Sequence, residues 1–184
     1  MAEPISFIEK ATILVVDDTP DNLTLMSGLL KDRYRVKVAN NGARALKIAE
    51  SDTPPDLILL DIMMPEMDGY EVCRHLKAGI KTRDIPVIFL TAKTDVLDET
   101  RGFELGASDY ITKPISPPVV LARVETHLAI KQVQDFLKDK NAFLEEEVNK
   151  RTAEVVAIQD VTINAMASLA ETRDNETGNH IRRT

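Results

Sequence analysis

Acidic side chains follow two apolar segments of this sequence, at the point where each segment ends. Asp17 and Asp18 come directly after residues 12–16, and Asp61 comes directly after residues 57–60. If both segments are parallel strands, their carboxyl ends lie along one edge of a sheet and the three carboxylates meet there. Clustered carboxylates repel one another unless a cation neutralises them, and oxygen ligands suit Mg²⁺ or Mn²⁺. The pattern predicts a divalent metal site, although an acid pair alone could equally serve to open a helix.

A hydroxyl group and an ammonium group follow two further apolar segments. Thr91 comes after residues 87–90, and Lys113 comes shortly after residues 109–111. At the same edge of the sheet they would place a hydrogen-bond donor and a positive charge beside the acids. A metal ion, a lysine and a hydroxyl together suit a phosphoryl group, because all three offset or bind its charged oxygens.

One of the carboxylates can itself accept that group, since aspartyl phosphates are known covalent intermediates. We predict Asp61 as the acceptor, with Asp18 on the metal directly and Asp17 on it directly or through water. The Lys113-Pro114 pair is compatible with a cis peptide bond. A haloacid-dehalogenase-like phosphatase would also gather acids at a strand end, but the Asp-x-Asp pair of such a site does not follow either strand.

The elements that must position these residues alternate between apolar runs and amphipathic stretches. This alternation predicts an α/β fold with a doubly wound (βα)5 parallel sheet. The expected strands are 12–16, 35–38, 57–60, 87–90 and 109–111, of which the first, third and fourth are apolar enough to be buried. The expected helices are about 20–31, 42–50, 70–78, 95–105 and from residue 118 onward.

A long segment without proline or glycine follows the last predicted strand. Between Pro118 and Gly178 neither residue occurs, which predicts one extended helix or two nearly continuous ones. A seven-residue repeat runs through it, with d positions at Ile130, Leu137, Leu144, Arg151, Ile158 and Ala165 and a positions at Gln134, Asn141, Val148, Val155, Thr162 and Leu169. This seam is typical of a coiled coil. A single amphipathic helix packed back on the α/β domain is the alternative.

Two features of the seam indicate how two copies would pair. Asn141 at an a position favours a two-stranded, parallel and in-register arrangement. Lys140 and Glu145 could then attract each other across the seam. We therefore expect a homodimer through this helix.

Composition limits the classes of function. The chain has 184 residues, of which 43% are hydrophobic, and 30 acidic against 23 basic residues give a net charge of −7. This balance argues against a broad nucleic-acid surface, and no run is long and apolar enough for a membrane span. The single cysteine, Cys73, cannot form an intramolecular disulfide, which favours the cytoplasm. We expect neither nucleic acid nor membrane as a partner.

Four motifs in order carry a resemblance to a known family. The motifs are Val15-Val16-Asp17-Asp18, Leu59-Leu60-Asp61-Ile62-Met63-Met64-Pro65-Glu66-Met67-Asp68-Gly69, Leu90-Thr91-Ala92 and Lys113-Pro114-Ile115. Together they resemble the receiver domain of bacterial two-component response regulators, over about residues 10 to 130. The resemblance implies a flavodoxin-like fold.

The same resemblance implies a set of roles. Asp61 takes a phosphoryl group from a phosphohistidine of a sensor histidine kinase or phosphotransfer protein. Mg²⁺ is held by Asp18, Asp61 and the backbone carbonyl of Met63. Thr91 and Tyr110 match the switch pair of the family, whose side chains move when the acceptor is phosphorylated.

The end of the sequence resembles a second family. The run Glu176-Thr177-Gly178-Asn179-His180 is similar to the start of the HD-GYP phosphohydrolase domain, which hydrolyses cyclic di-GMP. Glu176 and His180 are four residues apart and could share a helix face as metal ligands. The rest of that domain's signature is absent from this sequence, so we interpret the two residues as an exposed turn here. A di- or tri-metal centre belongs only to a complete HD-GYP domain.

These patterns predict four regions: an N-terminal extension (1–10), a receiver domain (11–128), a helical coiled-coil linker (129–170) and a stub of an HD-GYP domain (171–184). The expected function is a receiver that signals through a dimeric helix to a cyclic di-GMP phosphodiesterase missing from this chain. The alternative is a complete phosphorylation-dependent adaptor or scaffold whose coiled coil recruits a partner.

Overall fold

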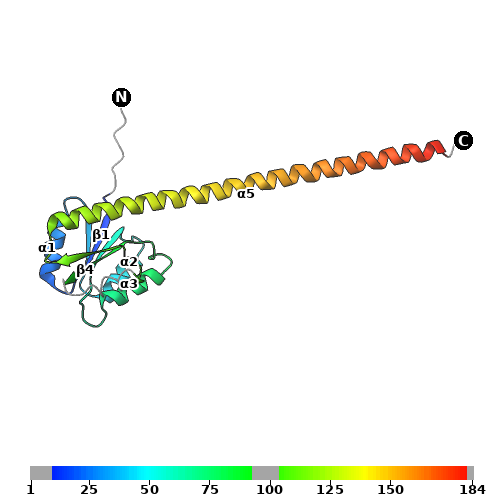
Figure 1. Ribbon diagram of the computed structural model, residues 1–184. Helices are drawn as coiled ribbons and strands as arrows, with labels where there is room; N and C mark the ends of the chain where they lie inside the picture. Colours follow the sequence, from blue (N-terminus) through cyan, green and yellow to red (C-terminus); the bar gives the residue numbers. More distant parts are fainter. Residues whose placement is uncertain (1–9, 93–103, 182–184) are drawn as a thin grey trace, which may run out of the picture. The chain divides into compact units, whose positions relative to one another are not determined.

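Figure 1 shows the computed structural model of the chain, which describes the backbone of residues 10–92 and 104–181 and the side chains of these ranges as far as Met166. The chain divides into two compact units, residues 1–133 and 134–184, which are described separately. The helix predicted at 95–105 lies almost wholly outside the described residues.

The first unit contains one sheet of five parallel strands in the order β2-β1-β3-β4-β5. The strands are β1 (Thr12–Val16), β2 (Arg35–Ala39), β3 (Leu57–Asp61), β4 (Val87–Ala92) and β5 (Asp109–Lys113). Because neighbouring strands pair in parallel, the carboxyl ends of all five strands lie at the same edge of the sheet. The predicted doubly wound, flavodoxin-like fold is confirmed.

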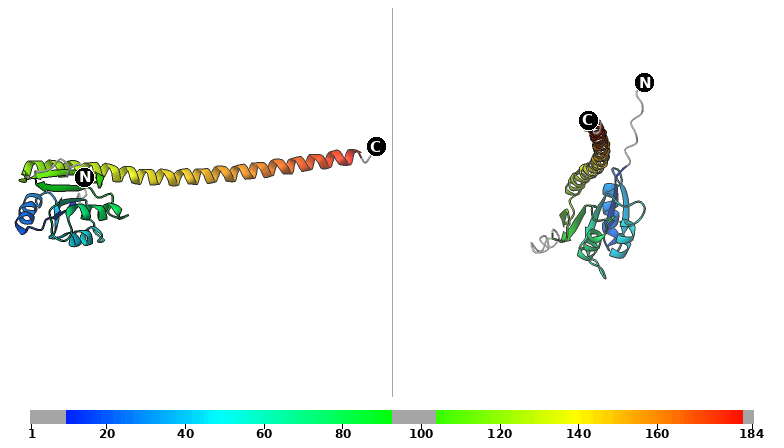
Figure 2. Two further views of the ribbon diagram at one scale, coloured as in Figure 1. Left: turned by 60° about the horizontal axis from the view of Figure 1, so that its bottom comes forward. Right: turned by 90° about the vertical axis from the view of Figure 1, so that its right-hand side faces the viewer.

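Helices cover both faces of this sheet (Figure 2). The helices are α1 (Pro20–Leu30), α2 (Gly42–Ala49), α3 (Gly69–Ala78) and α5 (Pro117–Ile181). One core cluster joins α2 and α3 to the sheet, with Ala45 and Cys73 packed among strand residues such as Leu60. The other joins α1 and the first turns of α5, with Met26 and Val124 on the opposite face.

The interior strands are buried on both faces, as their apolar composition predicted. All five residues of β1 and of β3, and the first four of β4, are buried. The sequence placed the ends of β2, β3, β4 and β5 one or two residues too early. Asp61 still pairs with Leu90, and Lys113 still pairs with Ala92. These polar residues therefore extend β3 and β5 beyond their apolar parts.

The helix starts reflect local capping. The side chains of Asn41 and Asp68 each accept a backbone N–H three residues later, at 2.8 Å and 2.7 Å, and α2 and α3 begin at the next residue. Helix α5 is a single uninterrupted helix and starts one residue earlier than predicted, at Pro117. No helix of the described residues is both long enough and apolar enough to cross a membrane.

A polar cluster attaches the receiver part of α5 to the sheet. Asp109 opens β5, and its Oδ2 contacts His127 Nε2 at 3.0 Å and also pairs with the Arg123 guanidinium. Its Oδ1 accepts the backbone N–H of Tyr110 at 2.8 Å. Burial opposes ionisation, but the hydrogen bonds from His127, Arg123 and Tyr110 outweigh it and lower the pKa of Asp109. The charged carboxylate therefore stabilises the fold.

We expect the substitution Asp109→Asn to lower the free energy of unfolding by about 2 kcal/mol at neutral pH, because it weakens charge-assisted hydrogen bonds. A lowered carboxyl pKa contributes stability above the unfolded value near 4, and this contribution disappears as the pH falls through the folded value. The difference from wild type should therefore shrink as the pH falls below about 4. Urea unfolding at several pH values measures it, with exposed Asp52→Asn as control. A difference that does not change with pH would contradict the electrostatic origin.

Candidate functional site

The carboxyl edge of the sheet brings together the three acids that the sequence singled out. Strands β1 and β3 are neighbours, with Val16 opposite Leu60, so the residues that end them are adjacent. One carboxylate oxygen from each of Asp17, Asp18 and Asp61 lies within 4.8 Å of the others. Asp17 is fully buried, Asp61 is 4% exposed and Asp18 is exposed. The cluster thus has two buried members and one that opens to solvent.

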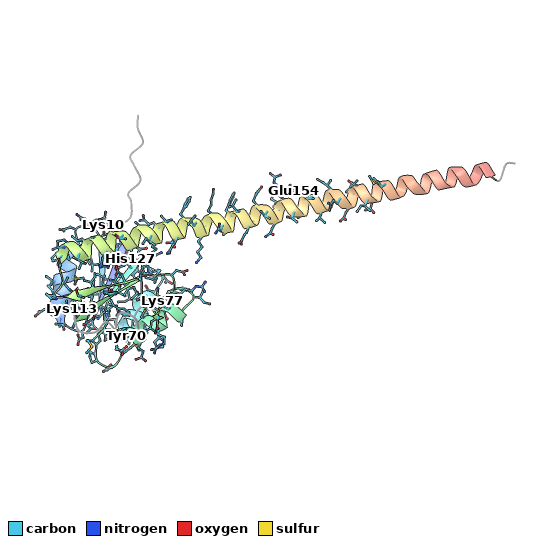
Figure 3. The ribbon with its side chains drawn as sticks, in the orientation of Figure 1. Lys10, Tyr70, Lys77, Lys113, His127 and Glu154 are labelled. Atoms are coloured by element: carbon cyan, nitrogen blue, oxygen red, sulfur yellow. The ribbon has the colours of Figure 1, made fainter. Side chains whose placement is uncertain are left out.

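Lys113 supplies the positive charge next to the buried acids. It ends β5, and its Nζ lies 3.0 Å from Asp61 Oδ2 and 3.1 Å from Asp17 Oδ2 (labelled in Figure 3). The sequence predicted the lysine at this edge, and the structure makes it a bridge between two carboxylates. The Lys113-Pro114 bond is cis, an isomer with which the sequence was compatible.

These contacts shift the titration of both partners. Burial raises the pKa of Asp61, against the opposing effects of Lys113 and of a hydrogen bond from the Met63 backbone. Burial alone would lower the pKa of Lys113, but its hydrogen bonds and charge interactions with Asp61 and Asp17 raise it. Lys113 therefore stays charged, while ionised Asp61 carries a desolvation cost that a cation would relieve.

Asn22 is a site residue that the sequence analysis missed. Its Nδ2 donates to both oxygens of Asp17, at 3.0 Å and 2.9 Å, and the backbone N–H of Thr19 donates to Oδ1 at 2.9 Å. The first turn of α1 therefore folds back over the strand end and orients Asp17. An amide in the first turn of a helix that follows an acid pair is the signal that could have revealed it.

Two other predicted residues are not drawn into the acid cluster. Thr91 lies in the last part of β4, and its hydroxyl donates to the Ala92 carbonyl at 3.1 Å. Tyr110 lies on β5, partly buried against the α2 and α3 side of the core. Both stand on the strands next to the cluster, so the switch assignment remains a prediction.

The remaining predicted residues are Met63 in the loop after β3 and two residues near the end of α5. Met63 follows β3, its side chain is 74% exposed, and its backbone N–H bonds to Asp61. Glu176 lies on α5, as does His180, but their side chains are outside the described residues.

A close backbone approach shapes the loop beside Asp61. The N–H of Gly69, the first residue of α3, donates to the Ile62 carbonyl at 2.9 Å. A Cβ at this position would lie 2.3 Å from the Asp61 carbonyl oxygen and 2.8 Å from the Ile62 Cα. Both are backbone atoms and cannot move aside easily, so only glycine fits here.

The cluster suits a hard divalent cation. Three carboxylates supply only oxygen donors, their oxygens are close enough to share one ion, and the exposed member leaves a route for it. Asp17, Asp18 and Asp61 would hold it, and it would offset charge on an incoming anion.

The described residues thus form a parallel five-stranded α/β sheet with acids at the carboxyl ends of β1 and β3 and a lysine at the end of β5. The family model described as "Response regulator receiver domain" matches residues 13–125. The chain belongs to this family.

Similar proteins place the receiver in several contexts. The chain is 52% identical over 177 residues, 96% of its length, to a "Probable cyclic di-GMP phosphodiesterase" of Vibrio cholerae, of which the match covers 40%. It is 46% identical over 134 residues, 72% of its length, to "Response regulator PleD" of Caulobacter vibrioides, of which 29% is covered. The chain thus spans less than half of each of these relatives.

Among solved structures, the chain is similar to the signal receiver domain of a signal transduction histidine kinase from Syntrophus aciditrophicus. The TM-score is 0.60 and the identity 41%, over 65% of this chain and 90% of that one. The matched share of this chain has about the length of its first unit, which contains the sheet.

We expect Gly69→Ala to lower the free energy of unfolding by about 1 to 3 kcal/mol, because the methyl group overlaps backbone next to Asp61. Gly28→Ala is the control: Gly28 is exposed within α1, and a Cβ there meets nothing within 4 Å. That variant should gain up to about 1 kcal/mol from helix propensity. Urea unfolding followed by circular dichroism compares them, and equal effects would show that the approach at Gly69 is not tight.

In metal-free buffer, Asp61→Asn should raise the free energy of unfolding by about 1 kcal/mol at neutral pH. Because the folded pKa of Asp61 is raised, the fold binds more protons than the unfolded chain, and wild-type stability falls as the pH rises through that window. The gain should fade toward about pH 4, where the wild-type carboxyl is protonated. Asp18→Asn, at the exposed acid, should change stability less. A destabilised Asp61→Asn variant at neutral pH would contradict the burial cost.

Proposed function

We propose that this chain is a phosphoryl-accepting receiver in which Asp61 is the acceptor. The observation that supports it most is the pairing of a nearly buried Asp61 with Lys113 at 3.0 Å, inside a cluster of oxygen donors. Receiver domains take phosphoryl groups from sensor histidine kinases or phosphotransfer proteins, and a partner of that kind is the phosphodonor expected here. The transfer would take place in the cytoplasm.

In the proposed reaction, a carboxylate oxygen of Asp61 attacks phosphorus in line with the donor nitrogen. The oxygen–phosphorus bond forms as the phosphorus–nitrogen bond breaks, and the leaving imidazole nitrogen takes up a proton. Lys113, already within reach of Asp61, offsets the charge of the phosphoryl oxygens.

The cation for this site is Mg²⁺, with Mn²⁺ as the close substitute, because both prefer oxygen ligands. Asp18, Asp61 and the Met63 carbonyl would hold it, and Asp17 would contact it directly or through water. When bound, the ion neutralises charge between the carboxylates and the phosphoryl oxygens.

The phosphorylated state would be recognised by two side chains. The Thr91 hydroxyl, which donates to the Ala92 carbonyl in this structure, would turn to a phosphoryl oxygen. Tyr110 lies on the adjacent strand β5, opposite Phe89 of β4. Its side chain would move into the space that the Thr91 side chain leaves. A change at β4 and β5 would then reach α5, which directly follows β5.

For the output, we propose a cyclic di-GMP phosphodiesterase of the HD-GYP type in the complete protein. The Vibrio cholerae relative carries the phosphodiesterase name, and its similarity extends over 96% of this chain and therefore along α5. The proposed domains are 11–128 for the receiver, 129–170 for a coiled-coil linker that pairs two copies, and 171–184 for the start of the output. The rival function is an adaptor that acts through the linker alone.

Treatment with acetyl phosphate and Mg²⁺ tests the acceptor directly. We expect intact mass spectrometry to show one phosphoryl group on the wild-type chain, none on Asp61→Asn, and none when a chelator removes the metal. Lys113→Met should react more slowly, because it removes the charge beside the acceptor. An adduct on Asp61→Asn, or none on folded wild type with Mg²⁺ present, would refute the proposal.

A further inference from the structure

Apolar side chains are exposed along residues 134–166 of α5, here called the stalk. In the predicted heptads, the seam residues Leu137, Leu144, Val148, Val155 and Ile158 are between 49% and 66% exposed. Such a row of branched side chains costs free energy in water and favours burial against a partner. Figure 3 shows side chains leaving the stalk on all sides, so the position in the heptad, not exposure alone, distinguishes the seam.

A shallow hollow lies on this seam. It is lined by Asn141, Leu144, Glu145, Val148 and Asn149. The first four of these are, in heptad terms, an a residue, the following d and e residues, and the next a residue. In a parallel two-stranded coiled coil, the hole that receives a d side chain of the facing helix has this composition.

We propose that a second copy of this chain occupies the hollow, parallel and in register, with Leu144 of each copy inserted into the hollow of the other. This inference rests on the dimeric linker of the proposed function. To the parallel, in-register pairing expected from the sequence it adds the hollow on the described helix and Leu144 as the side chain that fills it.

The polar residue in the hollow supports the parallel direction. In a parallel, in-register pair, Asn141 meets Asn141, and each amide can donate to and accept from the other. In an antiparallel pair, a residues face d residues, so Asn141 would face an apolar side chain and lose hydrogen bonds. Lys140 at g and Glu145 at e also attract each other only in the parallel register, which gives charge complementarity at the rim of the hollow.

Arg151 places a positive charge in the seam, and its contacts explain how pairing tolerates it. Its Nε lies 3.1 Å from Glu147 Oε1, and its Nη1 lies 3.4 Å from Glu154 Oε2 (Glu154 is labelled in Figure 3). The guanidinium is therefore turned along its own helix toward acids at two g positions. In the dimer, the two Arg151 side chains can face each other because acids of its own helix compensate the charge of each. An apolar residue at this position would nevertheless pack better.

Disulfide trapping in the full chain tests direction and register together. Leu144→Cys places two thiols opposite each other in the parallel, in-register pair, at a separation that a disulfide spans. Glu146→Cys is the matched control, because this f position faces away from the seam. The native Cys73 is buried and does not compete. We expect Leu144→Cys to cross-link at least about tenfold faster under mild oxidation.

Light scattering on the wild-type chain supplies a second readout that no substitution can disturb. We expect a dimer, and we expect Arg151→Leu to tighten it by about tenfold in dissociation constant. A monomer at all concentrations, a tetramer, or equal cross-linking of the two cysteine variants would overturn the proposal; the last result would indicate another orientation or partner. Acetyl phosphate labelling of the same samples distinguishes this failure from a failure of the receiver chemistry.

Discussion

The pair of contacts from Lys113 to Asp61 and Asp17 is the interaction on which the functional edge of this domain depends. Three carboxylates gathered at one sheet edge repel one another, and two of them are almost removed from water. Lys113 offsets this charge from within the fold, at 3.0 Å and 3.1 Å. Its position requires β5 to run parallel to β1 and β3 and to end level with them.

That requirement links the site to the rest of the unit. The strand order places β4 between β3 and β5, so backbone pairing connects Asp61 to Leu90 of β4 and Ala92 of β4 to Lys113. At its other end, β5 begins with Asp109, which Arg123 and His127 of α5 contact. The strand that carries Lys113 to Asp61 is thus also the strand that contacts the receiver part of α5.

Local sequence was sufficient to locate the five strands and helices α1, α2, α3 and α5, and to single out the acids and the lysine that meet at one sheet edge. The apolar runs located all five strands, and Asn41 and Asp68 opened their helices as capping residues do. Errors arose where polar residues prolong strands, as at Thr91, because pairing with a neighbouring strand is not visible in a single segment. Asn22 was missed for a similar reason, since its partner Asp17 lies outside its own helix.

From the amino-acid pattern alone, the nature of the site could be read, because parallel strands must deliver Asp17, Asp18, Asp61 and Lys113 to the same edge. The pattern could not say which of these acids lose contact with water or that Lys113 bridges two of them. Those properties depend on distances between residues far apart in the chain, such as the 96 positions that separate Lys113 from Asp17. Only packing of the whole sheet sets such distances, and the burial that comes with it raises the pKa of Asp61 and makes its ionisation costly without a cation.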